Sequence, residues 1–378
     1  MDTKISKLRK DLGQTKRWVI KIGSSLVTKN GLGLNNKLIL DWANQISQLV
    51  LAKRQVVVVS SGSVAEGASN LGWDKRPIEL NLLQAAAAVG QIGLSQAWFQ
   101  SFLQFGIKAA QLLLTHDDFA DRARYLNAKS TLITLLDFPV VPIINENDTV
   151  ATSELTLGDN DKLAALVCNL IEADMLVILT DEDGLMTADP RKNSRAKLVQ
   201  YSDVNSDRLD EFASGGGAWG RGGMVTKVEA GRLASRSATS TIIASGLKKN
   251  VLSEIASGRE VGTLLFSNAE KITARKQWLG GLLTTKGSIV LDDGACIALR
   301  ERGGSILSVG IKKVTGTFER GDLIEVLDLN SLKIATGFSN YSSGECDLII
   351  GKSSSEIEDV LGFSREPEVV HRDNLIVN

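Results

Sequence analysis

The chain has few of the residues on which metal centres, disulfide frameworks and histidine-dependent catalysis rely. Its 378 residues include three cysteines, which lie far apart and form no CxxC pair. The sequence therefore predicts neither a zinc site nor a disulfide framework, which fits a reducing cytoplasm. The only histidines are His116 and His371. A histidine-dependent triad or a histidine-rich metal cluster is therefore not expected.

Long apolar runs and an excess of one charge are also absent from the sequence. No apolar run approaches the length that would span a bilayer, and residues 1–17 are charged and lack the apolar core of a secretory signal. The formal net charge is −1, so bulk charge favours neither nucleic acid nor a membrane. With 43% hydrophobic residues and enough length for two domains, the chain is expected to be a globular, cytoplasmic protein.

Strand-like and helix-like segments alternate from about residue 17 to residue 266. Apolar runs of strand length occupy residues 18–22, 55–59, 109–115, 140–144, 175–180, 241–244 and 262–266. Helical segments occupy residues 37–53, 80–105 and 121–136, the run after Lys162, and the run from Lys227 to about Ser237. This alternation predicts a parallel sheet with helices on both faces. Gly90 and Gly93 indicate close helix packing along residues 80–105.

The segments that flank this alternating region have a different character. Residues 1–16 are polar and are predicted to form a loose tail or a short helix. Residues 267–280 are typical of a charged linker. From residue 281 to residue 372 the apolar runs are short and separated by glycine and aspartate, beginning with SIVLDDGACIAL. This pattern predicts a small β-barrel of short strands with one or two helices.

An acidic insert separates the apolar strand at residues 140–144 from the helix that follows Lys162. The insert carries Glu146, Asp148, Glu154, Asp159 and Asp161. A polar loop at the carboxyl end of a buried strand is where open α/β sheets place ligands. Acids gathered there repel one another unless an ammonium group or Mg²⁺ lies among them. The alternative interpretation is a solvated acidic loop.

Two apolar strands end in turns made of glycine and serine. Residues 18–22 include Lys21, a charge inside an apolar strand, and lead into Gly23-Ser24-Ser25. Residues 55–59 lead into Ser60-Ser61-Gly62-Ser63. Such turns present backbone N–H groups and hydroxyls that can cradle phosphate. Neither turn matches a P-loop or a GxGxxG motif, and serine and glycine also simply begin helices well.

A third glycine-rich segment, residues 215–223, contains six glycines. Glycine lets the backbone approach a ligand closely, and it also gives mobility. Lys227 follows at the head of the next helix, where a cation is unfavourable against the helix dipole. A bound phosphate would remove that conflict. The alternative interpretation is a merely flexible loop.

Six segments resemble, in this order, the amino acid kinase family and within it the branch that phosphorylates L-glutamate. They are VIKIGSS, VVVVSSG, PIINENDTVA, GDNDKLAA, LTDEDGLMTADPR and GGMVTK. The C-terminal pattern of DDGACIAL followed by VTGTFERGD resembles a PUA domain. The resemblance implies a parallel-sheet α/β/α sandwich of the amino acid kinase type over residues 17–266, followed after the linker by a PUA-like domain over residues 281–372.

The resemblance also implies roles for individual residues. Lys21 and Lys227 would contact the transferred phosphoryl group, and Asp161 would hold the two lysines. The substrate would contact Ser61, Gly62, Asp148 and Asn160. ATP would contact Lys21, Thr180, Asp181, Arg221, Gly222, Gly223, Met224, Val225, Thr226 and Lys227. Arg221 departs from the family, which commonly has a small residue there, and the metal ligands stay unassigned.

The reaction that the resemblance implies is ATP plus L-glutamate giving L-glutamyl 5-phosphate and ADP, the first step of proline biosynthesis, with Mg²⁺. A carboxylate nucleophile is already ionised at neutral pH, so a shortage of histidines is no obstacle. Inhibition by proline, a glutamyl phosphate reductase as partner and a homo-oligomer are further expectations from the family.

Rival functions differ in what they require of the acceptor site. A UMP kinase needs basic residues to bind the phosphate of its substrate. The substrate of an N-acetylglutamate kinase has no free amine that the acids could balance. An aspartate kinase would carry regulatory domains of another kind at its C-terminus. PUA modules also bind RNA, but residues 281–378 hold 10 basic and 15 acidic residues, a net charge of −5. Tight binding to a phosphate backbone needs a basic face, so the sequence argues against RNA binding.

Overall fold

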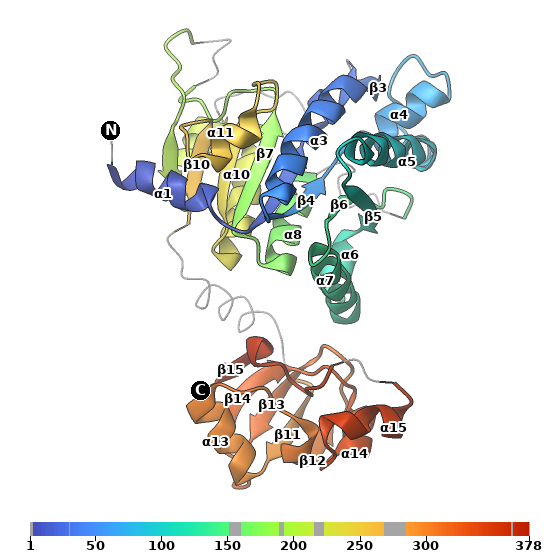
Figure 1. Ribbon diagram of the computed structural model, residues 1–378, viewed down its shortest axis with the longest axis vertical. Coiled ribbons are helices and arrows are strands. Elements are labelled where there is room, and N and C mark those ends of the chain that lie inside the picture. The colour runs from blue at the N-terminus through green and yellow to red at the C-terminus, as the bar shows by residue number, and fades with distance from the viewer. Residues whose placement is uncertain are drawn as a thin grey trace. The chain divides into compact units, whose positions relative to one another are not determined.

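The computed structural model describes residues 3–29, 31–150, 160–188, 193–214, 223–267, 285–363 and 366–377. The chain divides into two compact units (Figure 1). The larger unit comprises Met1–Ala120 and Asn127–Ala274, and the smaller comprises Asp121–Leu126 and Arg275–Asn378. We describe the two units separately.

The larger unit is built on an eight-stranded sheet with the strand order β5-β6-β4-β1-β7-β9-β10-β8. In chain order these strands are β1 (Arg17–Ile22), β4 (Gln55–Val59), β5 (Lys108–Leu114), β6 (Val140–Glu146), β7 (Met175–Thr180), β8 (Tyr201–Asp203), β9 (Ser240–Ser245) and β10 (Thr263–Phe266). Neighbouring strands are parallel except β9 and β10, which are antiparallel. Every residue of β4, β7 and β9 is buried, as strands covered on both faces require.

Helices and a small hairpin complete this unit. The helices are α1 (Thr3–Gly13), α2 (Ser24–Val27), α3 (Asn36–Leu51), α4 (Ser63–Asn70), α5 (Leu80–Leu103), α6 (His116–Ala120), α7 (Arg122–Leu136), α8 (Asn160–Ile171), α9 (Arg208–Ser214), α10 (Met224–Ala234), η1 (Ser235–Ser237) and α11 (Val251–Ala256). The first residues of α7, up to Leu126, belong to the smaller unit. Strands β2 (Thr28–Lys29) and β3 (Leu32–Leu34) form the hairpin. No helix in the described part of the chain has the length and apolarity needed to cross a membrane.

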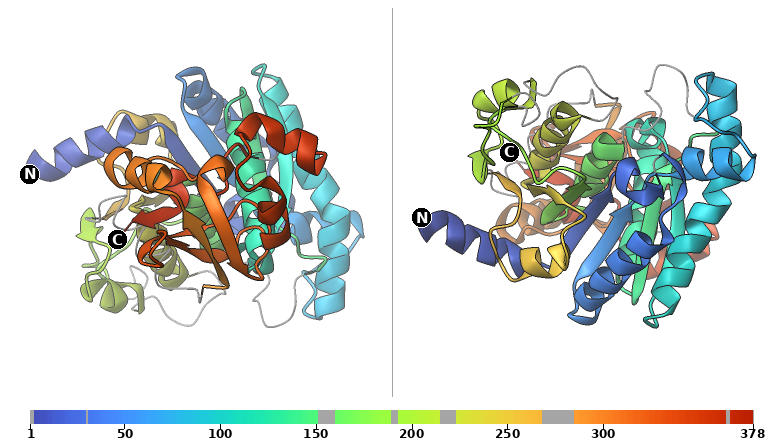
Figure 2. Two further views of the ribbon diagram at one scale, coloured as in Figure 1. Left: turned by 90° about the horizontal axis from the view of Figure 1, so that it is seen from below. Right: turned by 90° about the horizontal axis from the view of Figure 1, so that it is seen from above.

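Helices lie on both sides of the sheet (Figure 2), and strand β1 has one face toward each of these two layers. Its residues Trp18, Ile20 and Ile22 share one core with side chains from α3, α5 and α11. Side chains alternate between the two faces of a strand. Val19 and Lys21 therefore face the other layer, where α8 packs against β1. The charge inside the apolar strand is thus directed toward α8.

Of the two predicted alternatives for the N-terminal segment, the described residues form the short helix, α1, which is packed rather than loose. Ile5 and Arg9 are 8% and 3% exposed. The Arg9 guanidinium donates to the backbone carbonyls of Gln200, Val261 and Gly262 at 2.7–3.1 Å. These bonds fasten α1 to the segments around β10, because carbonyls at the ends of strands need donors that the sheet does not supply.

The smaller unit contains a five-stranded sheet with the order β12-β11-β13-β14-β15. The strands are β11 (Gly287–Leu291), β12 (Ile311–Gly316), β13 (Leu323–Leu327), β14 (Lys333–Phe338) and β15 (Leu375–Val377). Strands β11 and β13 are parallel and the other pairs are antiparallel. The helices are α13 (Asp293–Arg302), η2 (Ser308–Gly310), α14 (Ser343–Ile349), η3 (Ser354–Glu356), α15 (Ile357–Leu361) and η4 (Arg372–Asn374).

The expectation of short strands holds for this unit, whose five described strands have three to six residues, but the described residues within 285–377 form three α-helices where one or two were expected. The segment SIVLDDGACIAL divides into strand β11 and helix α13. The Asp292 side chain accepts a hydrogen bond from Ala295 N at 2.8 Å and caps the helix, and Gly303 ends it in the left-handed conformation with φ +59°. These capping interactions outweigh the strand-like apolar run that follows Asp292.

Candidate active site

Three buried charged side chains meet at one end of the parallel sheet. Lys21 Nζ lies 2.6 Å from Asp161 Oδ1, and Lys227 Nζ lies 3.0 Å from Asp161 Oδ2. Lys21, Asp161 and Lys227 are 6%, 2% and 6% exposed. Charged side chains are almost never buried to this extent unless they are paired or functional. We call these three residues the lysine–aspartate cluster.

Each member of the cluster comes from a different element. Lys21 projects from β1, Asp161 lies in the first turn of α8, and Lys227 lies in the first turn of α10. Helices α8 and α10 pack against each other. The Asp161 carboxylate is favourable at the N-terminus of α8, and it also compensates the ammonium group at the N-terminus of α10. A bound phosphate is therefore not required to remove the unfavourable charge of Lys227, which the sequence argument had assumed.

The charges of the cluster keep Asp161 ionised. Burial works to raise the pKa of the Asp161 carboxyl, but the ammonium groups of Lys21 and Lys227 and their hydrogen bonds lower that pKa to about 2. Two ammonium groups and one carboxylate leave the cluster with a net positive charge. Such a site, with little water around it, stabilises an anion strongly.

The residues predicted to bind the nucleotide lie around this cluster where the structure describes them. Thr226 Oγ1 lies 2.9 Å from Asp161 Oδ2 and 2.8 Å from the carbonyl oxygen of Gly223. Met224 and Val225 begin α10. Arg221 and Gly222 lie outside the described residues.

Thr180 and Asp181 end β7, the strand next to β1. Thr180 Oγ1 donates to Asp181 Oδ1 at 3.1 Å. Leu179 pairs with Ile22 in the sheet register, and the Gly23 N–H donates to the Leu179 carbonyl at 3.0 Å. The ends of β1 and β7 therefore meet beside Lys21, which brings the glycine-serine turn after β1 next to Thr180 and Asp181, the residues that the resemblance assigns to ATP.

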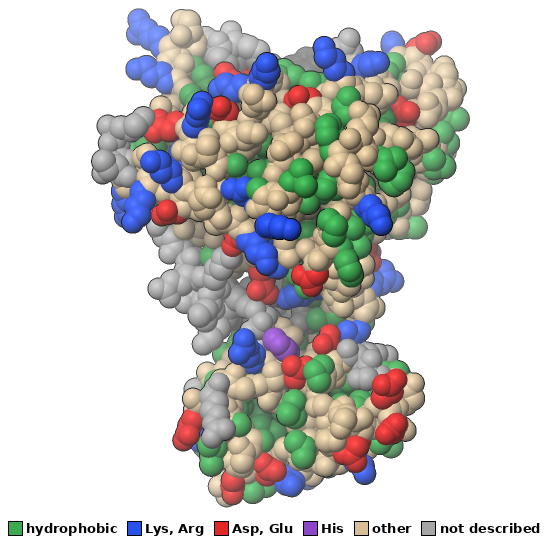
Figure 3. All heavy atoms as spheres, in the orientation of Figure 1, with side chains coloured by type: hydrophobic (Ala, Val, Ile, Leu, Met, Phe, Trp, Pro, Cys, Tyr) green, Lys and Arg blue, Asp and Glu red, His purple; other side chains and the backbone are tan. Residues whose placement is uncertain are grey.

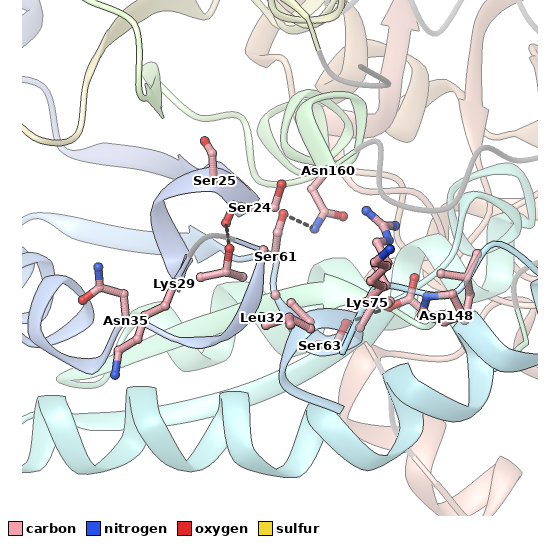
Figure 4. A pocket seen from close by; sticks show the side chains of 18 of the residues that line it. Ser24, Ser25, Lys29, Leu32, Asn35, Ser61, Ser63, Lys75, Asp148 and Asn160 are labelled. Atoms are coloured by element: carbon pink, nitrogen blue, oxygen red, sulfur yellow. Dashed lines mark hydrogen bonds between the residues drawn. The ribbon is translucent and has the colours of Figure 1, made fainter. Parts of the chain in front are cut away.

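The residues predicted to bind the acceptor substrate line a cavity of about 1330 Å³. Ser61, Gly62, Asp148 and Asn160 all belong to its lining. Figure 4 shows the hydrogen bond between Asn160 and Ser61, in which Asn160 Nδ2 donates to Ser61 Oγ at 2.8 Å. Asn160 immediately precedes Asp161 in α8. The cavity and the lysine–aspartate cluster are therefore joined through the first turn of α8.

The turn after β4 depends on Gly62. This residue has φ +117°, and a Cβ atom there would lie 2.9 Å from Val27 Cγ1. Only glycine adopts this conformation without strain in so small a space. The turn places Ser61 and Ser63 on the wall of the cavity, so the backbone conformation of Gly62 is needed to position these two serines.

Asp148 is the buried acid of the cavity. Its Oδ2 accepts a hydrogen bond from Ser63 Oγ at 3.0 Å, and the residue is 7% exposed. Burial raises the pKa of the Asp148 carboxyl, while the Ser63 hydrogen bond and the charge of Arg76 act in the opposite direction. A buried carboxylate of this kind gains most from a cationic group on its ligand.

Comparison with known proteins adds to this geometry. The model of the amino acid kinase family matches residues 16–245, which include the lysine–aspartate cluster. The chain belongs to the amino acid kinase family. The model of the PUA domain matches residues 287–361, so the smaller unit contains a PUA domain. The family resemblance inferred from the motifs is confirmed.

Curated members of the family match the chain over nearly all of its length. A glutamate 5-kinase of Hahella chejuensis is 52% identical over 373 residues, which are 98% of this chain and 97% of that protein. A glutamate 5-kinase of Pseudomonas putida is 52% identical over 371 residues, which are 98% of this chain and 100% of that protein. Among solved structures, a UMP kinase of Bacillus anthracis has a TM-score of 0.48 and 18% identity, covering 67% of this chain and 97% of that chain, a likeness too distant to bear on the substrate.

Several residues at the cavity were missed in the sequence. Ser63 and Asn145 belong to its lining and are 3% and 2% exposed. Both lie within segments identified in the sequence, the turn at residues 60–63 and PIINENDTVA, so their place in those segments could have predicted that they line the site. Three cations, Lys29, Lys75 and Arg76, also line the cavity, and the charge of Arg76 acts on Asp148. The acceptor side is therefore of mixed charge, so the basic residues that a UMP kinase needs do not by themselves separate that function from phosphorylation of L-glutamate.

The cluster fits the phosphoryl groups of ATP, because two buried ammonium groups share one carboxylate. In the part of the chain that the structure describes, no group of three or more His, Cys, Asp and Glu residues is arranged to hold a metal ion. Mg²⁺ commonly binds through substrate phosphates, one or two carboxylates and several waters. The described residues fit an ion that is bound mainly through the nucleotide.

Proposed function

We propose that this protein is a glutamate 5-kinase of the cytoplasm, which transfers the γ-phosphoryl group of ATP to the γ-carboxylate of L-glutamate. The products are L-glutamyl 5-phosphate and ADP, and the reaction is the first step of proline biosynthesis. The observation that carries the proposal is the buried lysine–aspartate cluster beside the cavity that contains Asp148. The relatives that share 52% of the sequence over 98% of this chain have that same activity in their names.

L-Glutamate fits the chemistry of the cavity. The Asp148 carboxylate would pair with the α-ammonium group. The guanidinium of Arg76, whose charge already acts on Asp148, would attract the α-carboxylate. Ser61 also lines the cavity, and its hydroxyl would direct the γ-carboxylate toward Lys21. Pairing of both charged groups gives the orientation that an in-line transfer requires.

The transfer itself needs charge stabilisation rather than a base. A γ-carboxylate oxygen of glutamate attacks the γ-phosphorus of ATP, and the bond to the bridging oxygen breaks, so that ADP leaves. The ammonium groups of Lys21 and Lys227 would stabilise charge on the moving phosphoryl group. Asp161 holds both ammonium groups in place. Mg²⁺ bound with the nucleotide supplies further neutralisation of phosphate charge.

The remaining part of ATP would lie along the ends of β7 and α10. Thr180, Asp181 and residues 221–227 are the groups proposed to bind it. The Thr226 hydroxyl donates a hydrogen bond to Asp161, so the same carboxylate would position a nucleotide-binding residue and the two lysines. Arg221 would add a cation to this part of the site.

The test is the formation of an acyl phosphate, trapped as a hydroxamate with hydroxylamine, together with ADP release from ATP and Mg²⁺. L-Glutamate, L-aspartate, N-acetyl-L-glutamate and UMP would be compared in parallel. Hydroxamate formed with L-glutamate alone supports the proposal. Turnover with UMP or N-acetyl-L-glutamate instead would retain the kinase chemistry and overturn the assigned substrate.

A homo-oligomer is proposed through the outer face of α5. The residues of this face recur every three or four positions: Leu82, Ala85, Val89, Ile92, Gln96, Phe99 and Leu103. The exposed fractions of Val89, Ile92, Phe99 and Leu103 are 39%, 74%, 43% and 52%. This spacing is the one by which two helices pack along a shared seam, and β5 beside it is an edge of the sheet. Figure 3 shows hydrophobic side chains gathered around α5. A second copy of the chain is the partner that a self-complementary face fits.

Proline is proposed as an inhibitor and a reductase as the downstream partner. Proline presents the same α-carboxylate and a cationic amine, so it would compete for Asp148 and Arg76. Addition of L-proline should therefore raise the apparent KM for L-glutamate in the hydroxamate assay. The acyl phosphate product hydrolyses readily in water, so a glutamyl phosphate reductase that takes it up promptly would preserve it.

A further inference from the structure

A row of hydrogen-bonded side chains leads from the cavity to the outer edge of the larger unit. Asn160 Nδ2 donates to Asn145 Oδ1 at 3.0 Å, and Asn145 Nδ2 donates to Gln91 Oε1 at 2.8 Å. Gln91 Nε2 donates to Ser95 Oγ at 3.1 Å, and Ser95 Oγ lies 2.9 Å from Gln111 Oε1. The row thus connects α8, β6, α5 and the edge strand β5.

The direction of this row is fixed at its inner end. Asn160 Nδ2 lies 2.7 Å from the backbone carbonyl oxygen of Ser60, and a carbonyl oxygen can only accept a hydrogen bond. The nitrogen of the Asn160 amide must therefore face Ser60 and Asn145. It follows that Asn145 presents its oxygen to Asn160 and its nitrogen to Gln91, and that Gln91 must present an acceptor.

The Asp148 carboxylate and the Asn160 amide both depend on the orientation of Asn145. Asn145 Nδ2 also donates to Ser63 Oγ at 3.2 Å, and Ser63 Oγ donates to Asp148 Oδ2 at 3.0 Å. Asn160 Oδ1 is buried, and no described group donates to it. Asn160 lines the cavity, so this oxygen is the acceptor that a bound ammonium group would satisfy.

We propose that Gln91 is a positioning residue for the amino acid substrate. Its Oε1 holds the amide of Asn145, which in turn supports Asn160 and, through Ser63, the carboxylate of Asp148. Gln91 lies on α5 and is not among the residues that line the cavity, so it acts only through Asn145. The inference rests on the proposed function, because it assigns Gln91 to recognition of the α-ammonium group of L-glutamate.

The test compares two substitutions of Gln91, one that removes the hydrogen-bond acceptor for Asn145 and one that keeps it. Gln91→Met keeps the length of the side chain and removes the acceptor. Gln91→Glu keeps an acceptor for Asn145, and the Ser95 hydroxyl can rotate to donate to its second oxygen. Gln100→Met, at an exposed position of the same helix, is the matched control.

We expect Gln91→Met to raise the KM for L-glutamate roughly five- to tenfold, the effect of losing one hydrogen bond. The KM for ATP and kcat should stay close to those of the wild type. Gln91→Glu and Gln100→Met should retain a KM near the wild-type value. The inhibition constant of glutarate, which lacks the α-amine, should be the same in wild type and Gln91→Met.

Three kinds of result overturn the inference. If Gln91→Met leaves the KM for L-glutamate unchanged, or if Gln91→Glu raises it as much as Gln91→Met does, Gln91 does not orient Asn145. If Gln91→Met lowers kcat or the melting temperature while Gln91→Glu and the KM values stay normal, the role is structural only. If the wild type forms no hydroxamate with L-glutamate, the proposed function fails, and this inference fails with it.

Discussion

At the scale of the residue, the molecule depends on one carboxylate between two lysines. Asp161 bonds both Lys21 and Lys227, which lie 140 and 66 positions away from it in the sequence. The sequence identified Lys21 by a physical signal, a charge inside an apolar strand. The pairing with Asp161 could not be derived from the residues alone, because it depends on the packing of α8 and α10.

Removal of the shared carboxylate should affect both stability and turnover. Asp161→Asn leaves two buried ammonium groups without their partner, so we expect the free energy of unfolding to fall by about 3–5 kcal/mol. The pKa of Asp161 is lowered from 3.8 to about 2. Its contribution is therefore present above the unfolded pKa and is lost as the pH falls toward 2. Denaturant unfolding at several pH values checks this, and an equal difference between variant and wild type at pH 7 and near pH 2 would contradict it.

Loss of one lysine should affect the rate more than the fold. In Lys227→Ala the carboxylate of Asp161 keeps its contact with Lys21, so the protein should stay folded. We expect kcat to fall about 10²–10³-fold, the effect of losing one group that stabilises transition-state charge. Lys162→Ala, at the exposed neighbour of Asp161, should keep near-normal turnover. A Lys227→Ala enzyme with normal turnover would remove this lysine from the mechanism.

Asp148 should show a conflict between stability and substrate binding. Burial raises the pKa of its carboxyl, so the ionised form costs stability at neutral pH. We expect Asp148→Asn to be more stable than the wild type at pH 7, with a difference that shrinks as the pH is lowered through the pKa of the folded state. The KM for L-glutamate should rise on the order of tenfold to a hundredfold, because a charge-assisted contact is lost. Thermal melts across pH and steady-state kinetics check both parts, and an unchanged KM would exclude Asp148 from substrate binding.

At the scale of the element, the cavity wall depends on how closely α4 approaches α5. A Cβ atom on Gly90 would lie 1.9 Å from the carbonyl oxygen of Ser63. A Cβ atom on Gly67 would lie 1.7 Å from the carbonyl oxygen of Ala86. The expectation that small residues allow close helix packing along residues 80–105 is confirmed at Gly90. Since Ser63 begins α4, the contact also sets the position of a residue at the cavity.

Widening this contact should weaken both packing and substrate binding. Gly90→Ala forces the two helices apart, and we expect it to lower the free energy of unfolding by about 1–3 kcal/mol and to raise the KM for L-glutamate through displacement of Ser63. Gly344→Ala is the matched control, because no atom lies within 4 Å of its Cβ position. Urea unfolding and kinetics of both variants provide the measurement. Equal effects of the two substitutions would refute the role of the contact.

At the scale of the whole molecule, the chain joins a kinase unit to a unit that contains a PUA domain. The exposed face of α5 adds a surface by which two copies would associate. Ile92 is 74% exposed in the middle of that face. An apolar side chain exposed to this degree within a row of others marks a surface of interaction.

A charge in the middle of this face should prevent association. We expect Ile92→Glu to convert the proposed oligomer to a smaller species, because two like charges would meet in an apolar seam. Leu348→Glu, at a residue of the smaller unit that is 62% exposed, should leave the mass unchanged. Light scattering after size-exclusion chromatography measures both. Identical masses for wild type and Ile92→Glu would place the interface elsewhere.

The sequence by itself determined the alternation of strands and helices and the family, and it predicted the phosphate-binding segments. These features are local, since an apolar run of strand length, a glycine turn or an acidic insert is complete within a few residues. The prediction for the smaller unit was wrong at α13, where the N-cap at Asp292 and the left-handed Gly303 define a helix that an apolar run concealed.

Only the tertiary structure decided which side chains meet. Asn145 and Gln91 are 54 positions apart, and Asn160 and Ser61 are 99 positions apart. Nothing in the residues around Gln91 distinguishes it from Gln100 on the same helix. The reason is physical: a hydrogen bond requires two atoms within about 3 Å in a fixed direction, and the order of strands in the sheet sets that distance, whereas the local pattern of residues does not.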